Sequence, residues 1–152
     1  GNTVLHYVAY VAEDWNPYRD LDMIKLLVSH GAELNQPNKK GETPLISAIK
    51  DRNILVVEYL LSLDKIDLNH VDKNGNAALR YLAEEGFYFH TLDLFLCKGA
   101  TPPSPEDLRS WDIEPEIEEF LIKHQQPKEA TLFTAPPEQT DADTGKDKIQ
   151  IM

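Results

Sequence analysis

Apolar residues recur with a helical period in a short segment that begins with a glycine turn. In GETPLISAI, residues 41–49, the apolar positions fall at i, i+3 and i+4, which is one face of a helix. Thr43 is placed to cap that helix with its hydroxyl, and Pro44 fits the first helical position, where no N–H is needed. Gly41 can take a positive φ in the preceding turn. The segment therefore predicts a turn followed by a capped helix, whose buried face comprises Leu45, Ala48 and Ile49.

The same pattern occurs twice more, as GNTVLHYVA (1–9) and GNAALRYLA (75–83), and the three leading glycines are 40 and 34 residues apart. Self-similarity at this period is typical of stacked supersecondary units. A leucine of the first apolar block and one of the second are 21 residues apart in the first copy, Leu5 and Leu26. The corresponding interval is 15 residues in the other two copies, from Leu45 to Leu60 and from Leu79 to Leu94. The first copy is thus expected to carry a six-residue insertion around residues 13–20. The second apolar blocks are residues 21–35, 55–69 and 90–103.

GETPLISA together with MIKLLVSHGAELN (23–35) resembles the ankyrin repeat, a β-turn followed by two antiparallel helices over about 33 residues. The resemblance implies an all-α solenoid of stacked helix-turn-helix units with β-turn fingers. The expected repeats are residues 1–40, 41–74 and 75–103. In the third repeat Ala77 and Ala78 replace the Thr-Pro pair, and Arg80 stands where the first repeat has His6. We expect the third repeat to be the less stable one, because it lacks the cap.

The pattern changes after Ala100, where three prolines in residues 101–108 argue against another regular finger. Ser104, followed by Pro105, is a good helix start. We interpret residues 104–124 as a degenerate fourth repeat that acts as a C-terminal cap, and residues 125–152 as an extended or flexible tail. No cap precedes Gly1, so we expect a piece of a longer protein; a tag scar before an open end is the alternative. The apolar face of the cap comprises Ile113, Ile117, Phe120 and Leu121.

The composition limits the possible partners. The 152 residues carry a net charge of −11, which argues against nucleic acid and anionic membrane as ligands. No apolar run is long enough to cross a bilayer. A single cysteine, Cys97, excludes an internal disulfide, suits a reducing compartment, and is expected to be a buried thiol in the second helix of repeat three. The predicted location is the cytoplasm, or the host cytosol if the protein is a secreted effector.

The sequence offers no constellation of catalytic residues. The ankyrin resemblance implies that His6 bonds backbone between neighbouring repeats, and His30 lies at a helix end, where a cation is favoured. The histidines lack metal-ligand spacing, and no glycine turn has the sequence of a phosphate-binding loop. We therefore expect neither enzyme activity nor a metal or cofactor.

The resemblance implies instead that another protein or peptide binds the finger turns and the exposed side of each first helix. Four lysines on this surface, Lys39, Lys40, Lys50 and Lys73, form a basic patch that would select an acidic or mixed peptide; simple solvation is the alternative. The implied positions are Asn2, Tyr10, Val11, Lys39, Lys40, Glu42, Lys50, Asp51, Lys73, Asn74, Asn76, Glu84 and Glu85.

Aromatic residues provide a second candidate surface. Trp15, Pro17 and Tyr18 in the insertion, with GFYFH (86–90), are placed to form a partly exposed apolar strip that anchors a partner. The alternative is that Trp15 folds back over repeat two and the phenylalanines belong to the core.

Three functions fit these patterns. The first is a non-catalytic interaction module, an adaptor or scaffold. The second is the targeting or substrate-recruiting domain of a larger enzyme or secreted bacterial effector. The third is a structural spacer.

Overall fold

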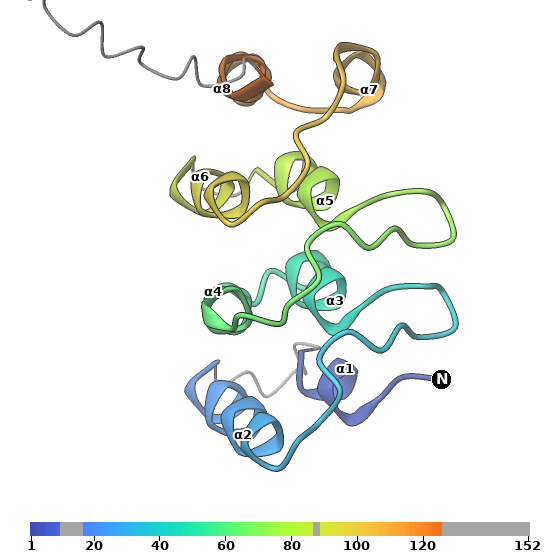
Figure 1. The fold of residues 1–152 in the computed structure, drawn as a ribbon, viewed down its shortest axis with the longest axis vertical. Helices are drawn as coiled ribbons and strands as arrows, with labels where there is room; N and C mark the ends of the chain where they lie inside the picture. Colours follow the sequence, from blue (N-terminus) through green and yellow to red (C-terminus); the bar gives the residue numbers. More distant parts are fainter. Residues whose placement is uncertain (10–16, 87–88, 126–152) are drawn as a thin grey trace, which may run out of the picture.

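The computed structural model describes residues 1–9, 17–86 and 89–125, and these fold into a stack of helix pairs. Figure 1 shows two columns of helices, α1, α3 and α5 in one and α2, α4, α6 and α8 in the other. Successive helices pack on one another along each column. The expected all-α solenoid of stacked helix pairs is confirmed. The helices are α1 Val4–Ala9, α2 Pro17–Ser29, α3 Pro44–Lys50, α4 Ile54–Ser62, α5 Ala78–Glu84, α6 Phe89–Cys97, α7 Pro105–Ser110 and α8 Pro115–Gln125.

Local sequence explains where α3 begins. The Thr43 hydroxyl accepts a hydrogen bond from the Ile46 amide at 3.4 Å, Pro44 is the first helical residue, and Gly41 has a φ of 81°. These three predictions are confirmed. The corresponding helix α5 follows Ala77, which supplies no side-chain cap. The lower stability of the third repeat remains a prediction.

The core is a continuous row of aliphatic side chains between the two columns. Each helix pair contributes at least one fully buried side chain to it, and neighbouring pairs share these contacts. Burial of this apolar surface is the main force that holds the stack together. Representative members are Leu5, Ile24, Leu45, Leu60, Leu82, Phe95 and Leu121.

Helix α2 has 13 residues, against nine in α4 and in α6. It begins at Pro17, so the second half of the predicted insertion at 13–20 forms the first turn of this helix. Residues 10–16 lie outside the described residues, and Tyr10, Val11 and Trp15 lie among them. The six-residue insertion itself stays a prediction.

Helices α7 and α8 are the last helix pair at one end of the described stack (Figure 1), and their role as a cap stays a prediction. Ser104 and Asp107 form a capping box at the start of α7. The helix start that the sequence predicted at Ser104 is confirmed. The Phe120 ring on α8 lies 5.4 Å from the Phe89 ring on α6 and 4.3 Å from the His124 ring, centroid to centroid. Residues 98–104 join α6 to α7 without a finger, and α7 lies to the finger side of α5 (Figure 1).

Two further observations concern exposure and membranes. The expectation of a buried Cys97 thiol is wrong, because this side chain, at the end of α6, is exposed. Thr91, Leu92 and Phe95 form the buried face of that helix, and Cys97 lies two residues past it.

Among the described residues, no helix is long and apolar enough to cross a membrane.

Candidate functional site

The first finger, residues 36–43, is a turn held by one asparagine. The Asn38 side-chain oxygen accepts hydrogen bonds from the Lys40 and Glu42 amides, at 2.8 and 3.0 Å. The backbone N–H of Asn38 donates to the backbone carbonyl of Glu42 at 2.8 Å and closes the turn. Asparagine can bond to its own backbone in this way, and this fixes the direction in which the finger points.

The second finger, residues 70–77, repeats this arrangement with an aspartate. The Asp72 carboxylate accepts hydrogen bonds from the Asn74 and Asn76 amides, at 2.8 and 3.0 Å, and from the Tyr81 hydroxyl at 2.6 Å. Burial raises the pKa of Asp72, but these hydrogen bonds outweigh it, so the pKa lies below its ordinary value. The finger is therefore rigid and tied to α5.

The two fingers stack directly on each other. The Lys73 amide donates to the Lys40 carbonyl at 3.1 Å, and the His70 Nε2 lies 2.9 Å from the Gly41 carbonyl oxygen. A Cβ atom at Gly41 would lie 2.8 Å from the Lys73 nitrogen, so only glycine fits at this contact. Finger stacking thus depends on backbone groups of both turns.

His6 connects the first repeat to the first finger. Its Nε2 lies 2.8 Å from the Glu42 carbonyl oxygen, and its Nδ1 accepts a hydrogen bond from the Thr3 amide at 3.1 Å. A carbonyl can only accept, so Nε2 carries the proton and the ring is neutral. The role that the family resemblance implied for His6 is confirmed.

A cleft of about 410 Å³ lies between α1, α3 and the first finger. Tyr7, which the sequence analysis did not select, lines it and is 67% exposed. The cleft brings together six of the predicted partner-binding residues: Asn2, Lys39, Lys40, Glu42, Lys50 and Asp51.

The charges in this cleft are partly paired. Lys50 Nζ lies 2.5 Å from Glu42 Oε1 and 5.0 Å from the centre of the Tyr81 ring. Burial raises the pKa of Glu42, but hydrogen bonds from Lys50 and Asn38 outweigh it, so the pKa is lowered. The pKa of Lys50 is raised for the matching reason, its hydrogen bond to Glu42 outweighing its burial. The other charged side chains of the cleft are the exposed Lys39 and Lys40 and the carboxylate of Asp51.

The remaining predicted residues that the structure describes lie elsewhere on the stack. Lys73 and Asn74 are exposed on the second finger, while Asn76 accepts a hydrogen bond from Arg80 at 3.0 Å. Tyr18 is 71% exposed and lines a separate hollow on α2, away from the fingers. Two glutamates form ion pairs at 2.7 Å, Glu84 with Arg80 and Glu85 with Arg52.

Comparison with known families gives a direct match. The model of a family described as ankyrin repeats, in three copies, matches residues 5–105. The chain belongs to the ankyrin repeat family. Ankyrin repeats are generally protein-interaction modules, and the family is typically non-catalytic. Within the described residues, no cluster of three or more histidine, cysteine, aspartate or glutamate side chains could hold a metal ion.

The chain is similar to short segments of much longer curated proteins. An ankyrin repeat protein of Acanthamoeba polyphaga mimivirus is 37% identical over 75 residues, 49% of this chain and 10% of that protein. An ankyrin repeat protein of Fowlpox virus is 52% identical over 46 residues, 30% of this chain and 8% of that protein. The palmitoyltransferase AKR1 of Lachancea kluyveri is 32% identical over 87 residues, 55% of this chain and 11% of that protein. The chain thus spans about a tenth of each relative.

Proposed function

We propose that this ankyrin repeat chain is a non-catalytic adaptor or scaffold that binds a partner protein through the first finger and the cleft beside it. The observation that supports this most strongly is the cleft, which gathers Asn2, Lys39, Lys40, Lys50 and Asp51 around Tyr7. Its walls are two helices and a hydrogen-bonded turn, so little conformational entropy is lost when a partner binds.

The charge of the cleft indicates the kind of partner. The paired carboxylate of Glu42 faces Lys50, while Lys39 and Lys40 are exposed and carry net positive charge within a chain of net charge −11. Opposite charge on a partner would speed association and orient the complex. The partner segment is therefore an acidic or mixed peptide.

Affinity capture from lysate of the source cells, followed by mass spectrometry, tests this function. The bait is the full chain, compared with its Lys39→Glu/Lys40→Glu variant. The matched control is Lys65→Glu/Lys98→Glu, which changes the same charge at exposed positions outside the cleft. A protein retained by wild type and control but lost by the cleft variant supports the proposal. A protein retained equally by all three baits contradicts it.

A second candidate is the recruiting domain of a larger enzyme. The similarity to part of a palmitoyltransferase, and the short span of each relative that the chain covers, favour it. The binding surface would be the same, and the full reading frame would distinguish the two functions. A catalytic domain in the same frame supports the recruiting function, and its absence favours the adaptor.

A further inference from the structure

The second finger has two backbone carbonyl groups at the positions where the carbonyl groups of the first finger contact the neighbouring finger. On the first finger, the Lys40 carbonyl accepts from the Lys73 amide and the Gly41 carbonyl contacts His70. The equivalent groups, 34 residues later, are the carbonyls of Asn74 and Gly75. Neither accepts a backbone hydrogen bond from any residue in the described ranges, and both residues are exposed.

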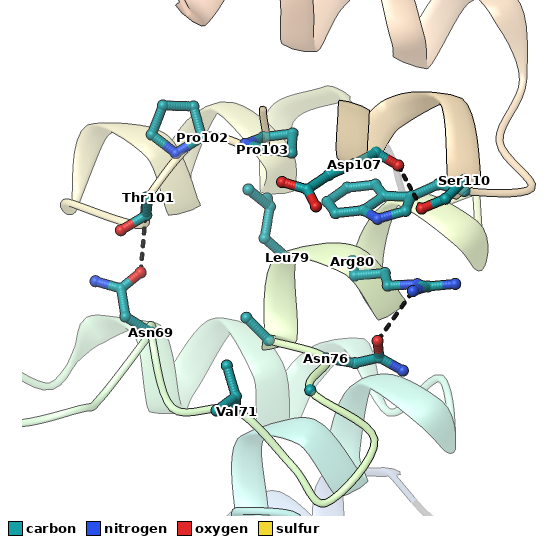
Figure 2. A pocket seen from close by; sticks show the side chains of 13 residues that line it. Asn69, Val71, Asn76, Leu79, Arg80, Thr101, Pro102, Pro103, Asp107 and Ser110 are labelled. Carbon is teal, nitrogen blue, oxygen red and sulfur yellow. Dashed lines mark hydrogen bonds between the residues drawn. The ribbon is translucent and has the colours of Figure 1, made fainter. Parts of the chain in front are cut away.

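A groove of about 350 Å³, lined by Gly75 and its neighbours, lies on the side of the second finger where a third finger would stack. It exists because residues 101–104 run directly from α6 toward α7 and form no turn. Figure 2 shows Val71 and Asn76 on one side of the groove, with Pro102 and Asp107 opposite them.

The walls of the groove supply hydrogen-bond acceptors and apolar surface. The charged side chains in these walls already form hydrogen bonds within the chain. Val71 is 54% exposed, and Trp111, which also lines the groove, is half-buried. Arg80 donates to Asn76 and to Glu84 and lies over the Trp111 ring at 5.9 Å. Such a groove favours an occupant that brings N–H donors and an apolar side chain rather than an ion.

We propose that this groove binds a β-turn loop of a partner protein, with the sequence Asn/Asp-x-x-Gly, in the position of a third finger. The first finger shows the required chemistry, because its own edge is covered by such a loop, Asp72 to Gly75, through the Lys73 amide. The C-terminal segment of this chain does not encode the loop. Residues 126–152 contain one glycine, Gly145, and the residue three before it is Ala142. This site is separate from the first-finger cleft and stands whether or not that cleft binds a partner.

A substitution at Gly75 can block the groove while the chain still folds. Gly75 has a φ of 79° and a Cβ atom there would meet nothing within 4 Å, whereas the same atom at Gly41 would collide with the covering loop. Asparagine tolerates this conformation, so Gly75→Asn should fold and place a side chain where the occupant's backbone must lie. Gly31→Asn is the matched control, with a φ of 81° and open space around it, outside the groove.

The experiment titrates a peptide with the sequence of residues 70–77, cyclised head to tail through an amide bond, into the full ¹⁵N-labelled chain. The same peptide with Asp72→Ala, which lacks the turn-forming carboxylate, is the peptide control. We expect saturable shifts of the Asn74, Gly75 and Asn76 amides and of the Trp111 indole N–H. Gly75→Asn should weaken binding by about tenfold or more, equivalent to ~1.4 kcal/mol, and Gly31→Asn should leave it unchanged.

Three results would overturn the proposal. One is the absence of shifts at millimolar peptide. Another is a set of shifts that Gly75→Asn does not change, or that the control peptide reproduces. The third is nuclear Overhauser contacts between the second finger and residues 126–152 in the free chain, which would make the chain's own C-terminal segment the occupant.

Discussion

Replacing each finger glycine by alanine separates backbone strain from finger stacking. Gly41 and Gly75 have φ values of 81° and 79°, so alanine is equally strained at both, by about 1–2 kcal/mol. Only at Gly41 does the new Cβ meet a neighbour, the Lys73 nitrogen at 2.8 Å. The fingers must then separate, which costs a further ~1–3 kcal/mol in forced displacement. Weakening the hydrogen bond from Lys73 to Lys40 adds about 1 kcal/mol.

Urea denaturation followed by circular dichroism measures this difference. We expect Gly75→Ala to lower the free energy of unfolding by about 1–2 kcal/mol, and Gly41→Ala to lower it by about 3–6 kcal/mol. Hydrogen exchange of the Lys73 amide should accelerate in Gly41→Ala only. Equal losses of stability in the two variants, with unchanged exchange at Lys73, would refute the argument that the fingers are held by direct backbone contact.

Three further outcomes follow from the structure. Because the pKa of Glu42 is lowered below its ordinary value of 4.5, its stabilising effect is present above that pH and is lost as the pH falls through the folded-state pKa. Glu42→Gln should thus cost about 1 kcal/mol at pH 7, less at pH 3, and an unfolding midpoint with the same pH dependence as wild type would contradict this. Ala77→Thr should add the missing cap and raise stability by about 0.5–1 kcal/mol, with slower hydrogen exchange in α5; unchanged exchange would count against a weak third repeat. Exposed Cys97 should react with a thiol reagent about as fast in the native chain as in urea, and strong native protection would contradict its exposure.

The sequence predicted those features that depend on neighbouring residues. The Thr43 cap, the turn at Gly41 and the start of α7 at Ser104 each depend on residues only three or four positions away from the feature itself. The role of His6 followed from the family resemblance, and the structure supplies its partner, the Glu42 carbonyl.

Helix phase was harder to predict from leucine spacing alone. The intervals that ended at Leu26 and Leu60 treated these residues as equivalent, but Leu26 is 54% exposed and Leu60 is fully buried. Each residue turns a helix by about 100°, so a shift of one position moves a leucine off the core face. In α2 the next residue, Leu27, packs against the core instead.

The candidate site shows the same limit. The basic patch was predicted from four lysines. One of them, Lys50 at the end of α3, forms an ion pair with Glu42 of the first finger, eight positions earlier. Trp111 lines the second-finger groove together with residues 69–80, which lie some thirty or more positions earlier. Such long-range pairings depend on the stack as a whole, and the local pattern around Trp111 carries no signal for them.

The most direct test of the interaction surface is hydrogen exchange of the chain with and without its captured partner. The account predicts that bound partner protects the backbone amides of residues 38–42 and of the α1–α3 cleft, and that Lys39→Glu/Lys40→Glu removes this protection. Protection confined to α2, α4 and α6, with the first finger unchanged, would contradict it.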